Sequence, residues 1–94
     1  MIVIYPAIFT ETNDNKDTVL IEIPDLDGRS EGYGLADAIF VAKDLIKEII
    51  WDLLDDDKEV PEPTDPENID VSEGAFFDAG VSQVMEVTVD VDEQ

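Results

Sequence analysis

The side chains of this sequence that could take part in chemistry are almost all carboxylates. The chain has 94 residues, of which 25 are Asp or Glu, and it contains no His and no Cys. The commonest general base, every thiol nucleophile and the usual zinc ligands are therefore absent. What remains is a carboxylate acid–base pair, or a carboxylate cluster that holds Mg²⁺.

Two groups of carboxylates are candidates for a metal-dependent hydrolase or nuclease. One is the pair Asp25 and Asp27 in a turn, and the other is the run Asp55–Asp57 with Glu59. In a sequence this acidic such groups arise by composition alone, and a run of like charge is typical of a solvated loop. We therefore expect no catalytic residue, no metal and no cofactor, and we keep the hydrolase as the alternative function.

Two further motifs are similar to ligand-binding loops but incomplete. The segment Asn13–Asp17 lacks the glycine that a calcium loop needs at its sixth position, and it lies between strands instead of helices. Gly28, Gly32 and Gly34 are not followed by the lysine of a phosphate loop. We expect a hairpin turn at the first motif, and turn geometry with positive φ at one or more of the three glycines.

The formal charge of −20 limits the partners that this chain can bind. Contacts to phosphate need Lys and Arg, so we expect no nucleic-acid and no anionic-membrane contact. A strong acidic field speeds association with a basic protein, although solubility alone also accounts for it. The basic residues are too few and too scattered to form a patch: Lys16, Arg29, Lys43, Lys47 and Lys58.

The length and composition predict one folded domain over residues 1–94. An apolar fraction of 44% is enough to form a core despite 32% charged residues. The N-terminus lacks the basic flank and cleavage site of a secretory signal, and no apolar run approaches the roughly 18 residues of a membrane span. We expect a cytoplasmic protein without disulfides.

Apolar patterning predicts three strands before the first helix. The stretch Ile2–Thr10 is β-branched and contains Pro6, which favours an edge strand or a bulge there. Thr18–Ile23 alternates and follows a turn, which predicts a hairpin. Arg29–Tyr33 is a short third strand, and a helix begins near Gly34.

The helix that begins at Leu35 is the clearest element in the sequence. Its opposite face carries Phe40 and Trp51, where a solvent-facing helix is normally polar. Either later parts of the chain cover these two aromatic residues, or they contact a partner or a second copy. The apolar positions of the helix share one face at helical spacing: Ala38, Ile39, Ala42, Leu45, Ile46, Ile49, Ile50 and Leu53.

After the helix we expect an extended connection and one long strand. The triplet Asp55–Asp57 is unfavourable at the negative end of a helix dipole, so we place it just beyond the last turn. Prolines make Val60–Gly74 an extended surface connection with one short turn after Pro66. Val81–Val91 alternates with a period of two, which predicts a strand with one buried face. The predicted class is α+β, with the order β-β-β-α-β and a long helix on one face of an antiparallel sheet.

Three segments of the sequence together resemble the HicB antitoxin family: Ile4–Phe9, Glu22–Gly28 and Gly32–Ala38. The resemblance extends over about residues 1 to 91. Asp27 stands where the family often has proline, and Arg29 and Gly34 replace residues that are more often small or acidic. These departures leave the turn before the third strand intact.

The resemblance implies a partial ribonuclease H fold without catalysis and an antitoxin function. Members of the family bind a small basic HicA toxin, which is an mRNA interferase with a catalytic histidine, and block its RNA-binding surface. Many also carry a C-terminal DNA-binding segment that recognises their own operator. This sequence ends at Gln94 without such a segment, because either the chain is trimmed or the natural protein lacks it.

We expect the toxin to contact the acidic turn and third strand, together with the aromatic residues of the helix. Aromatic anchors ringed by charge dominate many protein interfaces. A second copy of the chain, in a homodimer, is the other partner that these aromatic residues could contact. The expected partner-binding residues are Asp25, Asp27, Arg29, Glu31, Tyr33, Phe40 and Trp51.

Overall fold

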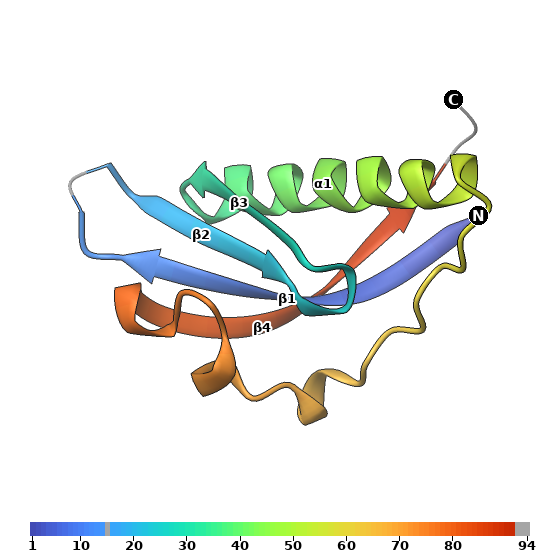
Figure 1. The fold of residues 1–94 in the computed structure, drawn as a ribbon. Coiled ribbons are helices and arrows are strands. Elements are labelled where there is room, and N and C mark those ends of the chain that lie inside the picture. The colour runs from blue at the N-terminus through green and yellow to red at the C-terminus, as the bar shows by residue number, and fades with distance from the viewer. Residues whose placement is uncertain (15, 92–94) are drawn as a thin grey trace.

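Alternating apolar residues build a four-stranded antiparallel sheet with one helix packed on it. In the computed structural model, which describes residues 1–14 and 16–91, the strand order is β3-β2-β1-β4. The expected α+β class and β-β-β-α-β order are confirmed (Figure 1). The acidic end 92–94 lies outside the described residues. The elements are β1 (Ile2–Thr12), β2 (Thr18–Ile23), β3 (Gly28–Tyr33), α1 (Leu35–Asp55) and β4 (Gly80–Asp90).

At Pro6, β1 is paired with β4 alone, so the expected edge position is found locally at this residue, whereas the alternative of a bulge is not found. β1 lies between β2 and β4, and its register with β4 runs unbroken over eleven residue pairs. The bond from the Val91 N–H to the Met1 carbonyl, 2.7 Å long, shows that odd-numbered residues of β1 turn their main chain toward β4. The missing N–H of Pro6 therefore points away from β4, and no bond to β4 is lost.

Two prolines end the pairing between β1 and β2. The register places Ile8 opposite Glu22. The next hydrogen-bonded pair along the ladder would join Pro6 to Pro24, and neither residue has an N–H. The chain instead leaves the sheet in a 3-10 turn, η1 (Pro24–Leu26). The first half of β1 is therefore paired with β4 alone.

The core lies between α1 and the sheet. Small residues let the helix approach closely: a Cβ on Gly32 would lie 2.7 Å from the Cα of Ala38, and one on Gly28 would lie 2.7 Å from Ile49 Cδ1. The expected positive φ is found at Gly34, where φ is 84°. At Gly28 and Gly32 the absence of a side chain instead makes room for α1. The buried core side chains include Tyr5, Phe9, Ile21, Ile23, Ile46, Ile50, Val87 and Val89.

The C-terminal end of α1 follows the expectation closely. Asp55 is the last helical residue, Asp56 caps the helix, and Asp57 has a φ of 54°. Two of the three carboxylates thus lie beyond the last turn, away from the negative end of the dipole. None of the helices in residues 1–14 and 16–91 is long and apolar enough to cross a membrane.

The connection from α1 to β4 runs over the sheet face opposite α1 (Figure 1). The expected turn after Pro66 is η2 (Pro66–Asn68). Two further turns, η3 (Val71–Glu73) and η4 (Phe77–Ala79), were not expected. The covering is partial: Ile8 on this face is buried, whereas Ile2 on the same face is 68% exposed.

β4 alternates as expected, but its burial is uneven along its length. Val87 and Val89 are buried beneath α1, as the pattern predicts. Val81 points to the same side of the sheet and is 70% exposed. The one buried face therefore exists only in the second half of β4.

Candidate functional site

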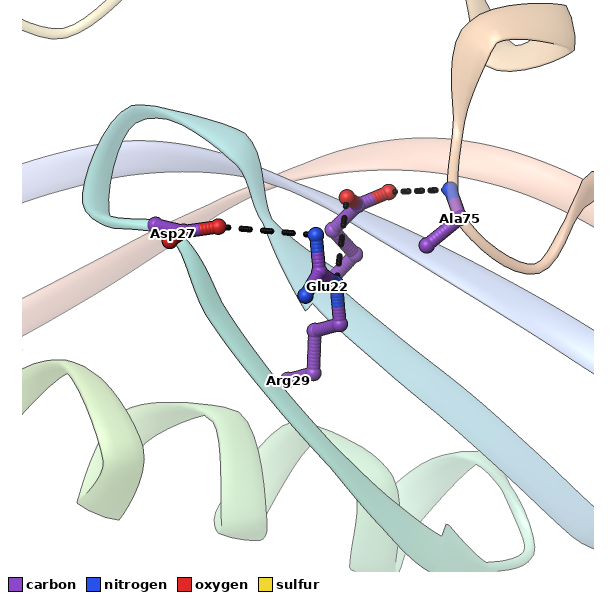
Figure 2. A network of polar contacts seen from close by, with 4 residues as sticks. All are labelled: Glu22, Asp27, Arg29 and Ala75. Atoms are coloured by element: carbon purple, nitrogen blue, oxygen red, sulfur yellow. Dashed lines mark hydrogen bonds and ion pairs between the residues drawn. The ribbon is translucent and has the colours of Figure 1, made fainter.

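A network of polar contacts pins the acidic turn to the connection that follows α1 (Figure 2). Glu22 lies at its centre: one carboxylate oxygen accepts a hydrogen bond from the Ala75 N–H at 3.0 Å, and the other lies 3.7 Å from Arg29 Nε. Arg29 Nη2 also lies 3.4 Å from the Asp27 carboxylate. The charge of Arg29 is thus offset within the domain.

Asp25 holds a second point of the connection. Its two carboxylate oxygens accept hydrogen bonds from the main-chain N–H and the hydroxyl of Thr64, at 2.9 and 2.6 Å. Asp25 is half-buried. Its carboxylate therefore stabilises the fold, and less of it is accessible to a partner protein than the sequence suggested.

The expected contact residues of β3 form one exposed row. Arg29, Glu31 and Tyr33 alternate with Gly28, Ser30 and Gly32, which face α1, so the three side chains point away from the helix. Tyr33 is 59% exposed. We call these three residues the β3 row.

The two aromatic residues of α1 have different environments. Phe40 is 64% exposed, so the later chain does not cover it, contrary to one of the two expectations. Trp51 is half-buried and packs against the core, with Lys47 Nζ 6.0 Å from the centre of its ring. The two residues are eleven positions apart in the helix, which is about 16 Å along the axis.

The seven expected residues therefore do not form one patch. Asp25 and Asp27 lie in the turn beside the β3 row, on the side of the sheet away from α1. Phe40 lies on the outer surface of α1, on the other side of the molecule, and Trp51 is half-buried against the core. Two separate exposed surfaces remain: the β3 row and the surroundings of Phe40.

The sequence reasoning missed an apolar surface at the start of β1. Met1, Ile2 and Ile4 are 56%, 68% and 42% exposed. The β-branched pattern of this stretch indicates a strand but does not show whether both of its faces are covered. The nearby Pro6 and Pro24 are the signal that could have shown that β2 does not continue beside it.

Tyr5 ties the connection to β1 beside this surface. Its hydroxyl donates a hydrogen bond to the Pro61 carbonyl. Burial raises the pKa of Tyr5 above its ordinary 10.0, and the negative charges of Asp25 and Glu62 raise it further.

Two exposed carboxylates have lowered pKa values because of local turns. Hydrogen bonds from Thr18 and Lys16 lower the pKa of Asp14, whose Oδ1 accepts from both main-chain N–H groups. This is the expected hairpin turn. Hydrogen bonds from Ser72 lower the pKa of Asp70 in the same way.

The part of the chain that the structure describes contains no cluster of side chains that could bind a metal ion. No three Asp or Glu side chains there lie close enough together to hold a metal ion. Asp25 and Asp27, the turn carboxylates of the hydrolase alternative, are engaged with Thr64 and Arg29. The exposed side chains of the β3 row and of Phe40 are charged or aromatic.

The comparisons with known proteins point in one direction. No known family profile and no curated protein sequence matches the chain. Among solved structures, a toxin–antitoxin complex from Streptococcus pneumoniae contains a chain with 27% identity and a TM-score of 0.81, over 97% of this chain and 71% of that one.

Two other solved structures share the fold at lower identity. One is a complex of HicA3 and HicB3, a toxin and antitoxin, with 22% identity and a TM-score of 0.64. The other is the N-terminal domain of the antitoxin HicB from Burkholderia pseudomallei, with 18% identity and a TM-score of 0.65. Each match covers 97% of this chain and 100% of the other.

Proposed function

We propose that this HicB-like antitoxin domain neutralises a small basic HicA-like toxin by covering its RNA-binding surface. The observation that carries the proposal is the similarity in structure to a chain of the S. pneumoniae toxin–antitoxin complex, which extends over 97% of the present chain. The resemblance seen in the sequence agrees with this similarity in structure. A toxin that cleaves RNA must bind phosphate, and its Lys and Arg are the groups that an acidic protein would occupy.

The distribution of charge supports a basic partner. The formal charge is −20, and Arg29 is held between Glu22 and Asp27. With 25 acidic and 5 basic residues, the chain has far too few cations to neutralise its carboxylates. Such a field steers a basic protein into contact and discriminates against acidic ones.

The β3 row is the proposed contact surface for the toxin, with Phe40 on α1 as a separate candidate. Tyr33 provides an exposed aromatic anchor, and Glu31 lies next to it on the same side of β3. Trp51 packs against the core, so Trp51→Ala would lower the stability of the domain and would not isolate a contact with the toxin. Tyr33→Ala should weaken toxin binding by about tenfold or more without unfolding the domain.

The test of the function is protection of RNA. A HicA-like toxin is incubated with an RNA substrate while this chain is added in increasing amounts. Cleavage should stop when the antitoxin reaches a fixed molar ratio to the toxin. Continued cleavage at a large excess of the chain would reject the proposal.

A control separates specific capture from general acidity. A poly-glutamate peptide of similar net charge should inhibit only weakly and only at low salt, because it lacks the folded surface. Equal inhibition by this peptide would show that charge alone accounts for the effect.

A further inference from the structure

The first half of β1 presents an open edge of main-chain hydrogen-bonding groups. β1 pairs with β2 only from Ile8 onward. Because odd-numbered residues of β1 bond to β4, the N–H and C=O groups of Ile2 and Ile4, and the carbonyl of Pro6, point to the side where β2 is missing. An edge of this kind is a template for another strand.

The segment Val60–Pro63 runs beside this edge without completing it. Pro61 and Pro63 have no N–H to donate. Within residues 1–14 and 16–91, no main-chain hydrogen bond joins Val60–Pro63 to β1, and the Tyr5 hydroxyl is the tether between them. A groove of about 430 Å³ lies between the two, and we call it the β1 groove; its lining consists of Ile2–Tyr5 and Val60–Pro63.

The β1 groove combines apolar side chains with the carboxylate of Glu62. Ile2 and Ile4 are exposed at its floor, on the sheet face away from α1. Glu62 is the carboxylate that lines the groove. Asp90, opposite Ile2 on β4, does not line it and lies 3.6 Å from the N-terminal ammonium of Met1. The chemistry that fits is an extended segment that alternates apolar and positively charged residues.

We propose that the β1 groove binds an extended Lys- or Arg-bearing segment of the toxin, which adds to β1 as a strand where β2 stops. This inference rests on the proposed function and adds a contact beyond the β3 row. The main chain of Ile2 and Ile4 supplies hydrogen bonds, their side chains contact apolar residues, and the Glu62 carboxylate, within a chain of charge −20, selects cations. A second copy of this chain is a poor occupant, because two chains of charge −20 repel one another.

Amide exchange on the free domain and with a probe peptide tests the groove directly. The probe is an end-blocked Lys-Val-Lys-Val-Lys-Val peptide, and an otherwise identical Glu-Val repeat is its control. In the free protein, Val3 and Tyr5 amides should be protected by β4, while Ile2 and Ile4 amides exchange fast. The Lys peptide should slow exchange at Ile2 and Ile4, and the Glu peptide should not.

Matched proline variants locate the edge that is used. Ile4→Pro removes an N–H from the open edge, and Thr88→Pro removes one from the outer edge of β4; neither change breaks a bond between β1 and β4. Ile4→Ala keeps the N–H and controls for the lost side chain. Peptide binding should weaken about tenfold further in Ile4→Pro than in Ile4→Ala, and stay unchanged in Thr88→Pro.

The outcomes separate this inference from the antitoxin function. If an inactivated HicA-like toxin binds Ile4→Pro as tightly as the unchanged domain, and the peptide protects β4 amides instead, the β1 groove is rejected while the antitoxin function stands. If no toxin binds the unchanged domain but the Lys peptide protects Ile2 and Ile4, the antitoxin function fails and the groove remains. Protection by the Glu peptide would reject charge selection at the groove.

Discussion

Tyr5 reports on the contact between β1 and the connection after α1. Burial and the charges of Asp25 and Glu62 raise its pKa above 10.0, so the neutral phenol is the form that the fold stabilises. This stabilisation is complete below pH 10 and is lost as the pH rises through the raised pKa of the folded protein. In a Tyr33→Phe background, phenolate absorbance should therefore appear above pH 10, and Glu62→Gln should move it downward. Titration at or below 10 would show that the hydroxyl is open to water.

Asp25 and Asp27 are close in sequence and should differ in energetic weight. Asp25→Asn removes a charged acceptor from the two bonds to Thr64, and should lower the free energy of unfolding by about 1–2 kcal/mol. Asp27→Asn keeps a residue that tolerates a φ of 51° and breaks only an exposed ion pair, so a change within about 0.5 kcal/mol is expected. Urea unfolding of both variants measures this. Equal effects would mean that the Asp25 contacts do not hold the connection.

At the scale of elements, the contact of α1 with β3 depends on two glycines. A Cβ on Gly32 meets the backbone of Ala38, which cannot move without shifting α1, so Gly32→Ala should destabilise the domain by about 2–3 kcal/mol. A Cβ on Gly28 meets the far end of the Ile49 side chain, which can rotate, so Gly28→Ala should cost about 1 kcal/mol or less. Chemical denaturation of both variants gives the ranking, and the reverse ranking would contradict the packing described here.

Elements with a strong period could be predicted from the sequence, and those held by distant contacts could not. The alternation of Thr18–Ile23 and the helical spacing after Leu35 indicate their structures directly. The turns η3 and η4 have no such period. The connection that carries them lies on the sheet through Glu22 with Ala75 and through Asp25 with Thr64, over sequence separations of 53 and 39 residues. Local patterns contain no information about such pairs.

The candidate site was predicted unevenly for the same reason. The exposure of Tyr33 follows from the alternation of β3. The small residues Gly28, Ser30 and Gly32 occupy the face that α1 approaches closely, so Tyr33 lies on the opposite face. The half-burial of Trp51 and the exposure of Ile2 depend on where neighbouring segments end. The first half of β1 lacks a strand on one side because of Pro6 and Pro24, which become neighbours only after the hairpin has formed.

For the whole molecule, the charge of −20 should make stability depend on salt. The like charges repel one another in the compact state more than in the unfolded chain, and added salt screens this repulsion. The free energy of unfolding in urea should therefore rise as sodium chloride is increased from about 10 mM to 500 mM. A fall over this range would mean that attractive ion pairs dominate, in conflict with the three found in residues 1–14 and 16–91: Met1 with Asp90, and Arg29 with Glu22 and with Asp27.

The measurement that tests the antitoxin function most directly is calorimetric titration of a catalytically inactivated HicA-like toxin into this domain at low and high salt. We expect one-to-one binding in the nanomolar range at low salt that weakens as salt is raised, because the association is electrostatically steered. Binding that does not respond to salt would move the main contact from the carboxylates to apolar groups such as Phe40. No binding at either salt concentration would contradict the antitoxin function.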